Sequence, residues 1–163
     1  MKLLFSFLLS VFLLGCYSKE PLKTGLEGKP LPSFSLLLPD SSTYLNTATI
    51  PSGHPIALFF YGPYCPYSRA QMEIILNNMS ELKDVHFYVF TSYPFHDMKK
   101  FYDDYQLNKY SNITAGIDYK LVFSNYYQVP GVPYLAVYDK NKLLKQAFIG
   151  QVYSKQIKSA IEE

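Results

Sequence analysis

The stretch from residue 56 to residue 79 constrains the fold more than any other part of this 163-residue sequence. Ile56 to Tyr61 is apolar throughout, which is typical of a central strand buried on both faces of a sheet. After a short turn, Pro66 begins a helical pattern that runs to about Met79, and proline suits the first position of a helix. The sequence therefore predicts a buried strand that leads through a tight turn into a helix.

The rest of the chain alternates short apolar runs with helical patterns and ends in a hairpin followed by a helix. This order predicts an α/β sandwich in which helices flank a central mixed sheet. The further strands are expected at residues 34–38, 85–91, 113–119, 134–138 and 143–149. The further helices are expected at residues 97–105, 122–127 and 154–161.

The first fifteen residues have the pattern of a secretory signal. Lys2 precedes an apolar run from Leu3 to Leu14, which is too short to span a bilayer about 30 Å thick. The run ends at Leu13-Leu14-Gly15-Cys16, which resembles a bacterial lipobox. We therefore expect residues 1–15 to be a lipoprotein signal peptide and Cys16 to carry the lipid. An ordinary signal peptide with a coincidental cysteine is the alternative.

Residues 16–30 are polar, with little apolar periodicity, and are expected to form a tether between the lipid and a domain at residues 31–163. Two or more acyl chains anchor a protein stably. The expected location is the bacterial cell envelope, outside the cytoplasm and facing the periplasm. The formal net charge is only +2 and there is no basic stripe, so nucleic acid is not an expected partner. We expect a monomer that reaches the membrane through its lipid.

The single cysteine of the expected domain, Cys65, lies where the buried strand gives way to the helix. Unpaired N–H groups and the positive end of the helix dipole favour a thiolate there, and the thiolate is the nucleophilic form of cysteine. No second cysteine and no histidine lies nearby in the sequence, so neither a metal nor another cofactor is expected. The alternative is a small apolar cysteine that only fills space.

Two motifs resemble those of the thioredoxin superfamily and, within it, of the TlpA-like thiol–disulfide oxidoreductases, or redoxins. Their first motif reads roughly F-W-x-x-W-C-P-x-C-R-x-E-M, and here it is Phe60-Tyr61-Gly62-Pro63-Tyr64-Cys65-Pro66-Tyr67-Ser68-Arg69-Ala70-Gln71-Met72. The second, a cis-proline before a strand, is matched by Gly131-Val132-Pro133-Tyr134. The resemblance covers about residue 28 to the C-terminus. It implies a thioredoxin-like sandwich with a short N-terminal strand pair and an insertion before the cis-proline.

The resemblance also implies roles for the matching residues. Cys65 would be the nucleophile, and the cis-proline loop would lie beside it. In the family, the backbone of the residue before the cis-proline pairs with an extended substrate peptide. The substrate-binding residues implied in this way are Tyr64, Pro66, Tyr67, Val132 and Pro133.

The sequence departs from the family pattern at three positions. Ser68 replaces the second cysteine, giving C-x-x-S, and a hydroxyl cannot attack a mixed disulfide. It could hydrogen-bond the thiolate or cap the first turn of the helix. Gln71 replaces an acidic residue that handles protons in some relatives, and Phe59 stands where thioredoxin has a buried aspartate. The ordinary dithiol cycle is therefore excluded.

Three functions remain open. In the first, Cys65 exchanges disulfides as a monothiol and needs an external thiol for release, with envelope proteins that bear disulfides or thiols, or a small thiol, as partners. In the second, the domain catalyses nothing and holds a partner protein or peptide in the groove between Cys65 and Pro133. The third is a peroxidase, which is the weakest because Gly62 stands where peroxiredoxins have threonine.

Overall fold

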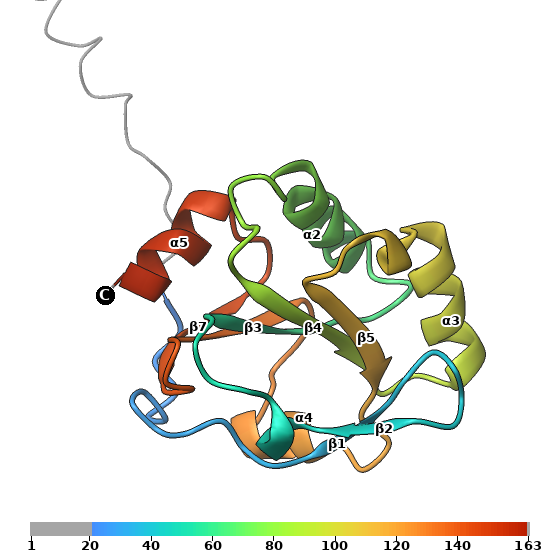
Figure 1. Ribbon diagram of the computed structural model, residues 1–163, viewed down its shortest axis with the longest axis horizontal. Helices are drawn as coiled ribbons and strands as arrows, with labels where there is room; N and C mark the ends of the chain where they lie inside the picture. The colour runs from blue at the N-terminus through green and yellow to red at the C-terminus, as the bar shows by residue number, and fades with distance from the viewer. Residues whose placement is uncertain (1–20, 163) are drawn as a thin grey trace, which may run out of the picture.

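The computed structural model describes residues 21–162, so the expected signal peptide and the expected lipidation site at Cys16 lie outside the described residues. The described chain forms one sheet with helices on both faces (Figure 1). The strands are β1 Ser35–Leu37, β2 Tyr44–Asn46, β3 Ile56–Phe60, β4 His86–Thr91, β5 Ile113–Ile117, β6 Tyr134–Tyr138 and β7 Leu144–Ile149. The helices are α2 Pro66–Asn77, α3 Phe95–Asp104, α4 Val122–Tyr127 and α5 Ser154–Glu162, with short 3-10 turns at Thr47–Thr49 and Leu107–Lys109. The predicted fold class is confirmed.

The strand order in the sheet is β2-β1-β5-β4-β3-β6-β7. Strands β3, β4 and β5 are parallel, whereas β6 and β7 at one side and β1 and β2 at the other pair antiparallel. The carboxyl ends of β3, β4 and β5 therefore meet the start of β6 at one edge of the sheet. We call this edge the thiol edge, because Cys65 follows β3 there.

Two apolar cores lie on the two faces of the sheet. The first contains buried side chains of α2, α3 and α5, including Met72, Phe101 and Ile157. The second lies under α4 and contains an aromatic group that includes Phe90, Phe123 and Tyr134. Figure 1 shows α2, α3 and α5 above the sheet and α4 below it. Because β3 alternates its side chains between these cores and is buried at all five positions, it reads as one continuous apolar run.

Residues 22–31, which we call the N-terminal segment, lie along the outer edge of β7. The Leu22 N–H donates to the carbonyl of Ala147 at 2.7 Å, and Gly28 and Lys29 exchange backbone hydrogen bonds with Leu144 at 2.7 and 2.9 Å. These residues were expected to belong to a polar tether, but in the structure they cover the unpaired groups of an edge strand. Leu22 and Leu26 also pack against the second core.

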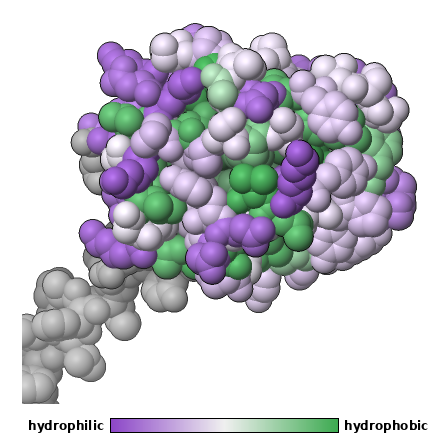
Figure 2. Space-filling view, turned by 90° about the horizontal axis from the view of Figure 1, so that it is seen from below, coloured by the Kyte–Doolittle hydropathy of each residue, from purple (hydrophilic) through white to green (hydrophobic). Residues whose placement is uncertain are grey.

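Every element expected from residue patterns is present, with bounds that agree to within two residues. The position of β2 was not found from the pattern, because a three-residue strand at the edge of a sheet carries little periodicity. Within residues 21–162, none of the helices is both long and apolar enough to cross a bilayer. Figure 2 views the molecule from below Figure 1, and apolar side chains there gather near the middle of the face.

We expect Gly116→Ala to destabilise the domain, because β1 approaches the backbone of β5 closely at this position. A Cβ at Gly116 would lie 3.0 Å from Leu36 Cβ and 3.0 Å from the carbonyl oxygen of Leu37. Overpacking of this kind costs about 1–3 kcal/mol. Urea unfolding measures the change, with Gly131→Ala as control because its nearest contact would be an ordinary 3.6 Å. Equal losses for both variants would contradict this account of the β1–β5 contact.

Candidate functional site

Cys65 occupies the N-cap position of α2, with an extended backbone at φ −77° and ψ 119°. Its N–H donates to the carbonyl of Gly62 at 3.0 Å, and its own carbonyl accepts from the N–H of Arg69 at 3.1 Å. Pro66 fills the first helical position, where a missing N–H leaves no partner unsatisfied. Cys65 is a free thiol and is partly exposed. The sulfur therefore lies at the positive end of α2 and within reach of solvent.

The loop before β6 lies directly against Cys65. The Val132–Pro133 peptide bond is cis. The Cys65 thiol donates to the carbonyl oxygen of Val132, with 3.6 Å between sulfur and oxygen. The chain can come this close because residue 62 is glycine: a Cβ there would lie 3.1 Å from Val132 Cγ2 and 3.4 Å from Cys65 Cβ. The two sequence motifs are thus spatial neighbours.

Ser68 is fully buried in the first turn of α2. Its hydroxyl accepts a hydrogen bond from the N–H of Gly62 at 3.2 Å. Among the described residues, no hydrogen bond joins this hydroxyl to Cys65. Two roles were expected for this hydroxyl, a hydrogen bond to the thiolate or a cap on the first turn of the helix. The observed bond matches neither fully, because its donor, the N–H of Gly62, belongs to the turn before the helix.

Gln71, the second departure, is also fully buried. Its side-chain amide donates from Nε2 to the carbonyl of Val152 at 3.0 Å, and its Oε1 accepts from the Val152 N–H at 2.6 Å. This pair of hydrogen bonds fastens α2 to the connection between β7 and α5. Phe59, the third departure, lies in the first core. At these two positions, where the resembled proteins have acidic residues, the side chains of this chain therefore serve backbone pairing and packing.

Helix α3 fastens the thiol loop from the other side. The hydroxyl of Tyr64 donates to Oδ1 of Asp97, a carboxylate that is only 6% exposed, and His96 Nε2 lies 2.8 Å from the same oxygen. The hydrogen bond to Asp97 raises the pKa of Tyr64. Burial, and then the charge of Asp97, raise the pKa of Tyr61. This contact could not be predicted from the sequence, because an aspartate in the first turn of a helix is common.

Arg69 supports the same loop. Its guanidinium donates to the carbonyl of Pro63 at 3.1 Å and to Oδ2 of Asp104 at 3.2 Å. The arginine of the family motif therefore connects the thiol turn to the end of α3, and its side chain also lies over the ring of Tyr105, 5.5 Å from the centroid.

The expected binding residues Tyr64, Pro66 and Tyr67 are exposed beside Cys65. Tyr93, at the end of β4, extends this aromatic surface, with its ring 6.1 Å from that of Tyr64. Tyr134, at the start of β6, is instead fully buried. Among the described residues, no group of three or more histidine, cysteine or acidic side chains is placed to hold a metal ion.

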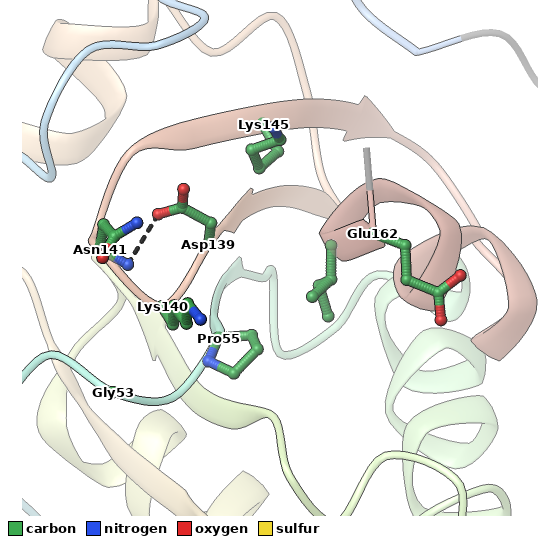
Figure 3. Close-up of a pocket in the computed structure, with 8 residues that line it drawn as sticks. Gly53, Pro55, Asp139, Lys140, Asn141, Lys145 and Glu162 are labelled. Carbon is green, nitrogen blue, oxygen red and sulfur yellow. Dashed lines mark hydrogen bonds between the residues drawn. The ribbon is translucent and has the colours of Figure 1, made fainter.

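A hollow of about 410 Å³ lies at the end of the sheet opposite the thiol edge. It is formed by the loop before β3, the β6–β7 hairpin and the end of α5 (Figure 3). Its lining includes Lys140, Lys145 and Glu162 but neither the cysteine nor the cis-proline loop. A much smaller hollow, of about 30 Å³, lies beside the thiol loop, and its lining includes Tyr64, Arg69 and Asp97. The exposed rings of Tyr64 and Tyr67 next to Cys65 suit contact with an extended chain.

No protein-family model matches the sequence, and no curated protein is significantly similar to it. Several solved structures share the fold. A secreted disulfide oxidoreductase of Mycobacterium tuberculosis, homologous to Escherichia coli DsbE, is 20% identical over 79% of this chain and 94% of its own, with a TM-score of 0.63. A thio-disulfide isomerase of Thermus thermophilus is 22% identical over 82% of this chain and 93% of its own, with a TM-score of 0.64.

The thioredoxin domain of a Bacteroides vulgatus thiol-disulfide oxidoreductase is 15% identical, covers 83% of this chain and 95% of its own, and has a TM-score of 0.65. At such identities the likeness concerns the fold alone. The chain therefore has a thioredoxin-like fold, as its two motifs indicate.

We expect Gln71→Glu to destabilise the domain in a pH-dependent way. The introduced carboxylate would face the Val152 carbonyl that now accepts a hydrogen bond at 3.0 Å, and leaving such a buried group unpaired costs about 1–3 kcal/mol. Burial raises the pKa of the new carboxyl above its unfolded value of about 4.3. The folded state then binds the proton more tightly, so the stability deficit is small below about pH 4 and grows as pH rises through the raised pKa.

Urea unfolding between pH 4 and 8 measures this deficit. Glu73→Gln is the control. Glu73 is exposed and lies two residues farther along α2, so its replacement should change stability little. A deficit for Gln71→Glu that is constant across the range would show that the buried amide pair with Val152 is not what holds this part of α2.

Proposed function

We propose that this protein carries out thiol–disulfide exchange through Cys65 alone, as a monothiol. The observation that carries the proposal is the placement of one accessible thiol at the start of α2, 3.6 Å from the Val132 carbonyl of the cis-proline loop. The similar solved structures include a disulfide oxidoreductase and a thio-disulfide isomerase. Ser68 leaves no second thiol in the described chain, so the exchange needs a partner thiol.

The chemistry consists of two exchanges. In the first, the Cys65 thiolate attacks one sulfur of a partner disulfide, forms a mixed disulfide and releases the other sulfur as a thiolate. In the second, an external thiolate attacks the partner's sulfur, forms a new disulfide and releases the Cys65 thiolate. When the attacking thiolate belongs to the same partner, the net result is isomerisation without oxidation or reduction. Cys65 stands at the N-cap of α2 throughout, beside the N–H groups of the first helical turn.

The cis-proline loop gives a means of holding the partner. Val132 offers its carbonyl, which the thiol now contacts, and within the described residues its backbone N–H has no acceptor. An extended peptide can pair with these two groups as an added strand. Tyr64 and Tyr67, 67% and 63% exposed, flank the sulfur and offer flat apolar contact with a polar tip. Disulfide- or thiol-bearing proteins fit this surface, and a small thiol can serve as the releasing agent.

We further propose that the protein acts in the bacterial envelope, on the periplasmic side, held by a lipid on Cys16. The apolar run that ends at Gly15-Cys16 supports a lipoprotein signal, and extracytoplasmic compartments are where disulfides persist. With Cys16 acylated, Cys65 is the single free thiol of the chain.

The second candidate function is that of a binding module without catalysis. It is favoured by the side chains of Ser68 and Gln71, both of which are buried in structural hydrogen bonds. The surface around Cys65 and Pro133 would then hold a partner, and the thiol would take no part. The two functions differ in whether Cys65 becomes covalently linked to other molecules.

We expect Cys65 to accumulate mixed disulfides in cells, because no internal thiol resolves them. Acid quenching, alkylation and a non-reducing gel should show adducts that disappear on reduction, and mass spectrometry should identify the partners. Cys65→Ala removes the sulfur and should abolish every adduct. A wild-type protein with Cys65 fully reduced and no adducts would support the binding module instead.

We expect Ser68→Cys to convert the site into a dithiol. Cysteine at position 68 restores C-x-x-C spacing at the start of α2, so oxidation should link it to Cys65 and block alkylation of both thiols. The adducts should fall below the wild-type level, because the new thiol resolves them. Ser80→Cys, at an exposed position beyond the other end of α2, is the matched control and should leave the adducts unchanged. If Ser68→Cys gives no internal disulfide and keeps the wild-type adducts, then the proposed geometry of exchange is wrong.

A further inference from the structure

Charge is unevenly distributed over the described surface. The N-terminal region and the C-terminal part, residues 21–30 and 139–162, contain seven lysines and only three acidic residues. Residues 31–138 contain five lysines and one arginine against eight acidic residues. The seven lysines lie on elements that surround the β7 edge of the sheet, and we call them the basic face. They are Lys23, Lys29, Lys140, Lys142, Lys145, Lys155 and Lys158.

Lysines outnumber carboxylates on the stretches that form the basic face, although Lys142 Nζ donates to the backbone carbonyls of Ala48 and Ile50 and Lys158 lines a hollow with Glu81 and Asp84. None of the seven lysines of the face is in an ion pair within the described chain. On α3, by contrast, Lys99 and Lys100 are each paired with an aspartate one turn later. The carboxylate of Asp139, the acidic residue nearest to Lys140 in the sequence, accepts instead from the backbone N–H of Asn141 and Leu143 in the hairpin turn. Figure 3 shows the hydrogen bond between Asp139 and Asn141, with Lys140 and Lys145 at the same hollow.

The described chain begins at this face. Leu22 pairs with Ala147 on the free edge of β7, and the N-terminal segment continues along β7 to Lys29. Leu22 is six positions after Cys16, and an extended chain of that length spans at most about 20 Å. A lipid on Cys16 would therefore keep the β7 edge, and not the far β2 edge of the sheet, close to the bilayer. In Figure 2 hydrophilic side chains line the left border, the side on which Figure 1 shows α5 and β7.

We propose that the basic face lies on an anionic phospholipid surface. This inference rests on the proposed lipid anchor at Cys16, which brings the face to the membrane. Acyl chains and a polybasic surface are the two signals that together hold a peripheral protein firmly. A lysine close to an anionic bilayer strengthens binding roughly fivefold, and the attraction falls off within about 8 Å at physiological salt. Contact is therefore needed, and the unpaired lysines around β7 supply it.

Docking in this way determines how far Cys65 lies from the bilayer and in which direction it faces. With β7 next to the lipid, the strands lie along the bilayer, and the thiol edge opens to the side. Cys65 follows β3, which is two strands from β7 in the sheet and so roughly 10 Å farther from the membrane. The thiol then faces disulfides held close to the membrane surface, and Tyr64 and Tyr67 remain free to receive them.

Protection of lysines from acetylation tests the proposal on the full lipid-bearing chain. The protein is bound to vesicles of phosphatidylglycerol and phosphatidylcholine, or of phosphatidylcholine alone, and labelling is quantified by mass spectrometry. We expect Lys140, Lys155 and Lys158 to be labelled at least fivefold more slowly on the anionic vesicles than on the neutral ones. Lys83, Lys109 and Lys120 are equally exposed but lie outside the face, and they should be labelled alike on both. Equal labelling of both sets on anionic vesicles would overturn the proposal.

Charge reversal gives a second measurement. The triple variant Lys140→Glu, Lys155→Glu and Lys158→Glu should bind anionic vesicles at least tenfold more weakly. The variant Lys83→Glu, Lys109→Glu and Lys120→Glu carries the same net charge, and it should bind within about threefold of the wild type. Thermal unfolding of both confirms that they fold. Equal losses for the two variants would show that only net charge matters, and would refute a specific face.

This proposal and the proposed anchor can fail separately. Mass spectrometry shows whether Cys16 of the wild-type chain carries a lipid, and the full chain with Cys16→Ser serves as the lipid-free reference. If Cys16 bears no lipid but the unmodified chain still prefers anionic vesicles through the three face lysines, the anchor is wrong and the basic face is right. If the lipid is present but the face lysines are labelled as fast as the controls, the face is wrong and the anchor stands. Face lysines protected only in intact cells would indicate an acidic protein partner and would contradict a lipid surface.

Discussion

The site depends on one close approach, between the turn that begins α2 and the cis-proline loop that begins β6. The thiol of Cys65 meets the carbonyl of Val132 at 3.6 Å, and the glycine at position 62 leaves just enough space for this contact. The approach is possible because β3 and β6 are neighbours in the sheet and pair along their whole length. Strand pairing deep in the core therefore fixes the distance between two loops that are 67 residues apart in sequence.

The rest of the structure holds the start of α2 in place from three sides. Gln71 ties it to Val152, Asp97 receives the hydroxyl of Tyr64, and Arg69 reaches both Pro63 and Asp104. Ser68 supports the turn from within. At positions 68 and 71, where the resembled motif has a cysteine and an acidic residue, the side chains of this chain hold the backbone in position. Cys65 and the cis-proline loop are held side by side without a second cysteine in the described residues.

Much of the fold could be predicted because its local signals agree with its tertiary structure. The uniform apolar run of β3 and the proline at the start of α2 define a strand–turn–helix unit without any knowledge of the partners. The contact between Tyr64 and Asp97 could not be found in this way, because it joins separate elements and neither residue type is unusual where it stands. The pairing of the N-terminal segment with β7 was missed for a related reason: its hydrogen bonds are made by the backbone, and a polar composition does not reveal them.

The N-terminal segment bears both on the stability of the sheet edge and on the proposed membrane contact. By covering the edge of β7 it prevents that strand from pairing with another chain, and it also places the start of the described chain among unpaired lysines. The thiol edge, at the ends of the same strands, carries the exposed rings of Tyr64, Tyr67 and Tyr93. The proposed surface for lipid and the proposed surface for partners therefore lie at different edges of the same sheet. Under the proposed monothiol cycle each adduct waits for a second molecule to release it, so the protein would gain from being held where both molecules pass.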